Sequence, residues 1–213
     1  SYADVPYGKN FPGKVLPGND PTKGNAFMGV PSANTYEEGI YVGYRYYNTF
    51  QVKPAYEFGY GLSYSTFGYG PLKLSSPTFG SALTATLTVT NTGQVAGKEV
   101  VQLYLSAPAG PLDKPESELK GFAKTGLLAP GQSQTLTFPL AAMDLASFDT
   151  PTSSWVAAAG TYTVRVGASS RAIKQQATFQ LPAAQVVLKS RPLLVPKQPI
   201  AELKAGQPRP ASR

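Results

Sequence analysis

Two pairs of glutamates are the residues of this 213-residue sequence best suited to acid–base chemistry. Glu37 and Glu38 are adjacent, and Glu116 and Glu118 are two positions apart. Two carboxylates that flank one bond can act as proton donor and as base or nucleophile. Adjacent strand residues point to opposite faces, so Glu37 and Glu38 are not expected to act jointly. Glu38 alone is a candidate catalytic residue, although a solvated or salt-bridged strand entry is favoured, and Glu116 and Glu118 are interpreted as solvated charges of a loop and an edge strand.

The sequence contains neither cysteine nor histidine. This composition excludes disulfides, thiolate nucleophiles, Cys/His metal sites and histidine-based triads within these residues. We expect no metal and no cofactor. A lack of cysteine is compatible with the cytosol or the periplasm, and we expect a secreted or periplasmic location rather than a cytoplasmic one.

Positive charge is scattered along the chain, although the formal net charge is +7. The densest group of basic residues lies near the end: Lys189, Arg191, Lys197, Lys204, Arg209 and Arg213. A nucleic-acid-binding protein gathers its charge on one element or face, so we predict no nucleic-acid partner. No apolar run approaches the roughly 20 residues that a bilayer-spanning helix needs, and we predict no membrane span.

Aromatic residues are concentrated between residues 36 and 67. Because each aromatic side chain buries about 150–250 Å², this run requires a packing partner, and we predict a seam between a following β domain and a larger body. Its tyrosines include Tyr41, Tyr44, Tyr46, Tyr47, Tyr60 and Tyr64. Interdomain packing is favoured over a sugar-stacking platform, and Arg45 is expected to pair with a carboxylate of the larger body.

Glycine, proline and asparagine dominate residues 1–35, where neither a helical nor an alternating period survives. Loops of this length are uncommon in compact domains and are usually functional or disordered. Scattered apolar side chains favour an ordered loop that lies on another body. Its asparagines, Asn19, Asn25 and Asn34, are the candidates for the rim of a substrate site.

Short strands separated by turn signals follow residue 67, a pattern typical of a β-sandwich. The expected strands are residues 83–90, 99–105, 118–124, 135–140, 160–167 and 177–181. Residues 40–47 predict a further strand and residues 143–148 one helical turn, while Trp155 lies in a predicted loop. Pro139 ends the pairing of its strand or places that strand at a sheet edge. Residues 184–213 are Pro-rich and are expected to dangle or to run extended across another domain.

Six motifs occur in order along the chain. They are E-G-I-Y-V-G-Y-R-Y-Y (38–47), F-G-Y-G-L-S-Y-S-T-F (58–67), N-T-G-x-x-A-G-K-E-V-V-Q-L-Y-L (91–105), K-P-x-x-E-L-K-G-F (114–122), L-x-P-G-Q (128–132) and G-T-Y-T-V-R-V-G (160–167). The last four resemble the fibronectin type III-like domain that closes many glycoside hydrolase family 3 enzymes. The first two resemble the connector between that domain and the family's α/β-sandwich domain.

The resemblance implies a mainly β fold with three parts. Residues 68–183 would form a fibronectin type III-like (immunoglobulin-like) β-sandwich. Residues 1–67 would be an extended loop and strand segment that ends an α/β-sandwich domain and provides the connector. Residues 184–213 would be an extended, Pro-rich, basic tail.

The resemblance also implies retaining hydrolysis of β-glucosides, for which two carboxylates lie about 5–5.5 Å apart. In the family, an aspartate nucleophile lies in an N-terminal (β/α)8 barrel and a glutamate acid/base usually lies in the second domain. Both lie upstream of these residues, so we expect no catalytic residue here and no activity of this chain alone. Its partners would be the barrel and α/β-sandwich portion of the same enzyme, on a separate or continuous chain. The alternative is a free-standing carbohydrate-binding or adhesion module, which requires an exposed aromatic row.

Overall fold

A computed structural model describes residues 14–20, 22, 29–193 and 195–206. The chain divides into two compact units. The first unit combines Ser1–Val42 with Leu194–Arg213, and the second unit is Gly43–Leu193. In the sequence, the second unit therefore lies between the two halves of the first. The domain boundaries drawn from the motifs, after residues 67 and 183, remain predictions.

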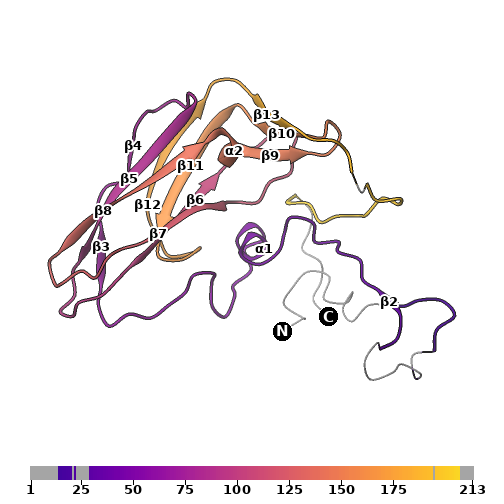
Figure 1. Cartoon of the computed structure of the whole chain (residues 1–213), viewed down its shortest axis with the longest axis horizontal. Helices are drawn as coiled ribbons and strands as arrows, with labels where there is room; N and C mark the ends of the chain where they lie inside the picture. The colour runs from indigo at the N-terminus through magenta and orange to yellow at the C-terminus, as the bar shows by residue number, and fades with distance from the viewer. Residues whose placement is uncertain (1–13, 21, 23–28, 194, 207–213) are drawn as a thin grey trace. The chain divides into compact units, whose positions relative to one another are not determined.

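Two four-stranded sheets form the centre of the second unit (Figure 1). One sheet has the order β12-β11-β6-β7, and in the other β5 pairs with β3, β4 and β8. The strands are β3 (Phe67–Tyr69), β4 (Lys73–Leu74), β5 (Ala82–Asn91), β6 (Val100–Ser106), β7 (Glu118–Lys124), β8 (Ser133–Ala141), β11 (Gly160–Gly167) and β12 (Ile173–Leu181). The mainly β fold with a fibronectin-like sandwich is confirmed.

Strict alternation of apolar and polar residues gives β5 one buried face. The side chains on this face are at most 2% exposed: Leu83, Ala85, Leu87 and Val89. Alternation of this kind places every second side chain in the core. Pro139 lies in β8, opposite Thr84 of β5. Among the described strands, β8 pairs only with β5. The prediction that Pro139 marks an edge strand is confirmed.

The hydrophobic core combines side chains from both sheets. The sheet with the order β12-β11-β6-β7 contributes mainly Val101, Leu103, Leu105, Tyr162, Val164, Val166, Phe179 and Leu181. Tyr162 and Phe179 stack with ring centroids 5.3 Å apart and planes 6° from parallel. The Tyr162 hydroxyl donates to the Ala158 carbonyl oxygen at 2.8 Å, which satisfies a polar group inside an apolar core.

A small sheet with the order β13-β10-β9 corrects two expectations. Its strands are β9 (Ala146–Asp149), β10 (Ser154–Ala157) and β13 (Gln185–Lys189). Trp155 was expected in a loop but lies in β10 between Phe148 and Leu188, and its ring meets Phe148 edge-on at 5.5 Å. β13 also places residues 185–189 of the predicted tail in a sheet. Strands this short have too few residues to display a period, so pairing with neighbours decides their conformation.

Residues 142–149 divide between a helix and a strand. α2 (Ala142–Leu145) is followed directly by β9. The expected helical turn over residues 143–148 is therefore correct only in its first part. Ala141 N donates to the Asp144 carboxylate at 2.8 Å, a contact that stabilises a helix N-terminus.

The strand predicted over residues 40–47 is wrong, because α1 (Tyr44–Thr49) is a helix. Gly43 precedes it with φ of 57°, a conformation that favours glycine. Tyr46 and Phe50 are four positions apart, and their ring centroids lie 5.1 Å from each other on one side of the helix. Such contacts stabilise a helical turn. Tyr46 is 2% exposed, so packing has overridden the strand preference of aromatic residues.

The described part of the first unit contains a short strand pair and several turns. β1 (Lys14–Val15) pairs with β2 (Ser32–Ala33), and residues 37–40 form one of the turns. Leu203 is 2% exposed, and its N–H donates to the Glu37 carbonyl oxygen at 2.7 Å. Residues near the end of the chain are thus held within this unit. No helix among the described residues is long and apolar enough to cross a membrane.

Candidate functional site

Glu37 and Glu38 lie in a turn rather than at the entry of a strand. The N–H of Tyr41 donates to the Glu38 carbonyl oxygen at 2.9 Å and closes this turn. Glu38 Oε2 is buried and accepts no hydrogen bond from the described residues. The strand-entry interpretation is therefore wrong. A catalytic role for Glu38 stays a prediction.

The asparagines proposed for the substrate rim have different surroundings. Asn19 Nδ2 donates to the carbonyl oxygens of Leu16 at 3.1 Å and Pro17 at 3.4 Å, which stabilises its own exposed turn. Asn34 is exposed. Asn25 lies outside the described residues. A role for these residues at a rim stays a prediction.

Arg45, Glu118 and Lys120 form a cluster of charges in the second unit. Arg45 Nε lies 3.4 Å from Glu118 Oε1, and Lys120 Nζ lies 3.3 Å from Glu118 Oε2. The expected pairing of Arg45 with a carboxylate of another body is wrong, because Glu118 belongs to the same unit. Glu118 is also not a solvated charge, since its side chain is 27% exposed and contacts two cations.

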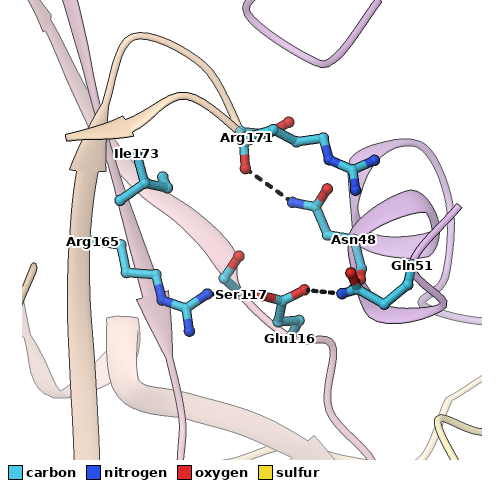
Figure 2. Close-up of a pocket in the computed structure, with 8 residues that line it drawn as sticks. Asn48, Gln51, Glu116, Ser117, Arg165, Arg171 and Ile173 are labelled. Atoms are coloured by element: carbon cyan, nitrogen blue, oxygen red, sulfur yellow. Dashed lines mark hydrogen bonds and ion pairs between the residues drawn. The ribbon is translucent and has the colours of Figure 1, made fainter. Parts of the chain in front are cut away.

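A polar cavity of about 180 Å³ lies between four stretches of chain, which are α1 and the residues after it, the segment before β7, β11, and the loop that leads into β12 (Figure 2). We call it the Asn48 cavity, and it is lined by Asn48, Gln51, Glu116, Ser117, Arg165, Ser170, Arg171 and Ile173. Glu116 Oε1 accepts from Arg165 at 2.8 Å, and Glu116 Oε2 accepts from Gln51 at 3.2 Å. Glu116 is thus a paired, half-buried carboxylate, and the prediction of a solvated loop charge is wrong.

The tyrosines of α1 pack within the second unit. The ring of Tyr44 lies 5.6 Å from that of Tyr104 and 5.2 Å from that of Phe58. Its hydroxyl accepts from Leu119 N at 2.8 Å, and the ring of Tyr46 contacts Tyr47 at 5.5 Å. Tyr44 therefore packs on the sandwich of its own unit, and Tyr46 packs on neighbouring rings of its own segment. The predicted packing between domains stays a prediction.

An exposed apolar strip follows α1 in the sequence. We define the exposed strip as Tyr56 (72% exposed), Phe58 (50%), Tyr60 (48%), Leu62 (90%) and Tyr64 (99%). Large apolar side chains gathered on one exposed segment are typical of an interaction site.

The first part of this strip is hydrogen-bonded to the loop between β11 and β12. Ser170 N donates to the Phe58 carbonyl oxygen at 2.9 Å, and Ser169 Oγ donates to Glu57 Oε1 at 2.9 Å. Gly59 has φ of +84°, and a Cβ there would clash with the Gln102 side chain. The backbone thus approaches the sandwich closely at Gly59, while Leu62 and Tyr64 farther along the strip are almost fully exposed.

Glu99, immediately before β6, is a half-buried carboxylate. Tyr69 donates its hydroxyl to Glu99 Oε1 at 2.9 Å. Burial raises the pKa of Glu99 above its ordinary value of 4.5, while the Tyr69 hydrogen bond and the charge of Lys174 oppose that rise. Burial and the adjacent carboxylate raise the pKa of Tyr69 far above its usual range, so Tyr69 remains the donor.

Exchanging Glu99 for glutamine is expected to remove a pH-dependent loss of stability. A group whose pKa is raised on folding contributes its full stability below the unfolded-state pKa and loses it as pH rises through the folded-state pKa. The contribution of Glu99 to the free energy of unfolding should therefore fall as pH rises from about 4.5, the ordinary pKa of Glu99. The glutamine can still accept from Tyr69, so the variant should lack this decrease. Urea unfolding at a series of pH values measures the difference, and parallel pH profiles for the two chains would contradict it.

Comparison with known proteins shows which families and proteins this chain is similar to. The fibronectin type III-like domain family (Fn3-like) matches residues 99–170. A β-glucosidase from Rhizobium radiobacter is 38% identical over 196 residues, which cover 87% of this chain and 24% of that protein.

The solved structures that are similar to this chain are also β-glucosidases. The structure of β-glucosidase 3B from Thermotoga neapolitana in complex with α-D-glucose matches with a TM-score of 0.75 and 49% identity over 87% of this chain and 24% of that one. A GH3 β-glucosidase from Bifidobacterium adolescentis matches with a TM-score of 0.67 and 38% identity over 73% of this chain and 23% of that one. The chain spans about a quarter of the length of these relatives. It therefore belongs to glycoside hydrolase family 3 and corresponds to the C-terminal portion of that family's β-glucosidases.

Proposed function

We propose that this chain is part of a retaining β-glucosidase that hydrolyses terminal β-linked glucosyl residues, and that it stabilises the catalytic domains. The observation that carries the proposal is the match to β-glucosidases across 87% of the chain but 24% of each relative. Retention requires two free carboxylates about 5–5.5 Å apart. Glu116 and Glu118 are both held by arginine or lysine side chains, which suits a structural role.

The exposed strip is the surface that we assign to the remainder of the enzyme. Leu62 and Tyr64 are 90% and 99% exposed, in a segment whose flanking residues Phe58 and Thr66 accept backbone hydrogen bonds from Ser170 and Thr92. Leaving such side chains in water is costly, and burying them is worth about 25 cal/mol per Å² of apolar surface. The occupant is the barrel and α/β-sandwich portion of the same enzyme. The segment that contains Asn19 and Asn34 then edges the substrate entrance.

We expect the 213-residue chain alone to hydrolyse no aryl β-glucoside, because the nucleophile and the acid/base belong to the remainder of the enzyme. The enzyme that contains both portions should release p-nitrophenol from p-nitrophenyl β-glucoside. A matched enzyme with the exposed strip changed to serine should lose activity and stability together. Turnover by the isolated chain would contradict the proposal, as would full activity of the remainder without this chain.

A carbohydrate-binding module is the second candidate function, and the exposed rings of Tyr56, Phe58, Tyr60 and Tyr64 favour it. Aromatic rings that face solvent can stack on the apolar faces of sugars. Calorimetric titration of the isolated chain with a soluble β-glucan distinguishes the two functions. Saturable binding that the Tyr60→Ser and Tyr64→Ser variants lose would support the binding module. The absence of binding would leave the strip to the catalytic portion.

A further inference from the structure

Phe122, in β7, is a large apolar side chain that the sandwich leaves in water. It is 71% exposed. Its neighbours in the strand face inward, because Ala123 packs against the core and a Cβ at Gly121 would meet the ring of Phe138 at 3.3 Å. Successive strand residues point to opposite faces, so Phe122 lies on the outer face. β7 ends the order β12-β11-β6-β7, and no other described strand follows it in that sheet (Figure 1).

The exposed strip passes directly beside Phe122. Phe122 lies opposite Gln102 of β6, and opposite residues of an antiparallel pair share a face, with Cβ atoms about 4.5–5.5 Å apart. The Gly59 backbone covers Gln102 on that face, because a Cβ at Gly59 would clash with the Gln102 side chain. Phe122 and the strip residues next to Gly59 therefore belong to one exposed surface.

A cavity of about 380 Å³ hollows this surface between the strip and the two strands. Tyr60 and Leu62 line it from the strip, and Val100 and Lys124 line it from β6 and β7. Lys124 is two positions beyond Phe122 and therefore points to the same face. A partner that covers the strip from Tyr60 to Leu62 thus also faces the outer side of β6 and β7.

The catalytic portion of the same enzyme is the occupant, an assignment that rests on the proposed function. The chain covers only 24% of the β-glucosidase from Rhizobium radiobacter, so most of such an enzyme lies outside it. Stable interfaces bury about 800 Å² on each partner and are enriched in aromatic residues at their centre. The strip is a single segment of chain, and the outer face of β6 and β7 provides the additional width that such an interface needs.

We propose that the interface with the catalytic portion extends from the exposed strip across the outer face of β6 and β7, with Phe122 as its apolar anchor at the edge of the sheet. The surface lies wholly on residues of the second unit. Because Phe122 is largely exposed in this chain, its burial in the whole enzyme would be contributed by the partner.

Hydroxyl-radical footprinting of the whole enzyme and of the 213-residue chain tests the proposal without any substitution. Phe122 and Tyr64 should both be oxidised several times more slowly in the whole enzyme. Phe148, a half-exposed phenylalanine of the small sheet, is the matched control and should react equally in both. Protection of Tyr64 without Phe122, or equal protection of Phe148, would overturn the inference and leave the proposed function intact. Protection of neither Tyr64 nor Phe122 would contradict the proposed function as well.

Substitution of Phe122 in the whole enzyme provides a second measurement. Phe122→Ser should shorten the half-life of β-glucosidase activity at a fixed elevated temperature about tenfold, because it removes a buried aromatic side chain from the interface. The same change in the 213-residue chain should leave its unfolding midpoint nearly unchanged, and Phe122→Leu should retain most of the half-life. Val186→Ser, at a 58% exposed position of β13, is the matched control. Equal half-lives for the Phe122→Ser and Val186→Ser enzymes would overturn the inference.

Discussion

Replacing Asn91 with alanine is expected to lower the free energy of unfolding of the second unit by about 3–5 kcal/mol. Asn91 ends β5 and is 0% exposed. Its Nδ2 donates to the carbonyl oxygens of Val95 and Leu128, each at 2.8 Å. Its Oδ1 accepts from Ser65 Oγ at 2.6 Å and Gly93 N at 3.0 Å. Alanine leaves these groups without their partner, and each buried orphan costs about 1–3 kcal/mol.

Two further variants make this measurement specific. Asn91→Asp retains the acceptor oxygen but cannot donate to the two carbonyls, so a large loss is expected there as well. Thr90→Ala, in the same strand, removes only an exposed contact with Ser133 and should change stability by less than about 0.5 kcal/mol. Urea unfolding followed by circular dichroism provides all three values. Equal losses for Thr90→Ala and Asn91→Ala would refute the assigned role of Asn91.

Replacing Tyr162 with alanine is expected to cost about 3–5 kcal/mol. The ring is 0% exposed and stacks on Phe179 at the centre of the core. Removing it leaves a cavity that a close-packed interior cannot fill. Chemical denaturation with tryptophan fluorescence from Trp155 measures the loss.

The Tyr162→Phe variant separates the ring from its hydroxyl. This variant keeps the stack and removes the hydrogen bond to Ala158, so a loss of about 0.5–1.5 kcal/mol is expected. Burial also raises the pKa of Tyr162 to about 12. In an ultraviolet titration, Tyr162 should therefore ionise at a higher pH than the exposed tyrosines. A Phe variant as unstable as the alanine variant would show that the hydroxyl, and not the stack, dominates.

The sandwich was predictable from the sequence because long strands display their period. In β5 the apolar side chains Leu83, Ala85, Leu87 and Val89 alternate with polar ones, and all four are buried. Gly160–Gly167 shows the same alternation, and the structure has β11 over those residues. Each of these segments has enough residues for one buried face to be recognised.

Short segments and contacts between distant segments were not predictable. Tyr44–Thr49 is aromatic and resembles a strand, yet the helical contact between Tyr46 and Phe50 decides its conformation. The partner of Glu116 is Arg165, on a strand that the sequence does not place beside it. The Asn48 cavity is assembled from four separate stretches of chain, so no spacing of residues could have indicated it.

The hydrogen bond from Leu203 N to Glu37 O joins residues on opposite sides of the whole second unit in the sequence. The sandwich is therefore an insertion within the first unit. Forming this bond brings together two chain segments that the inserted module connects. The conformational entropy lost on closure increases with the length of flexible chain between the two segments. A folded sandwich removes most of that flexibility, whereas an unfolded one restores it. Covalent connectivity alone thus couples the stability of the first unit to the folding of the second.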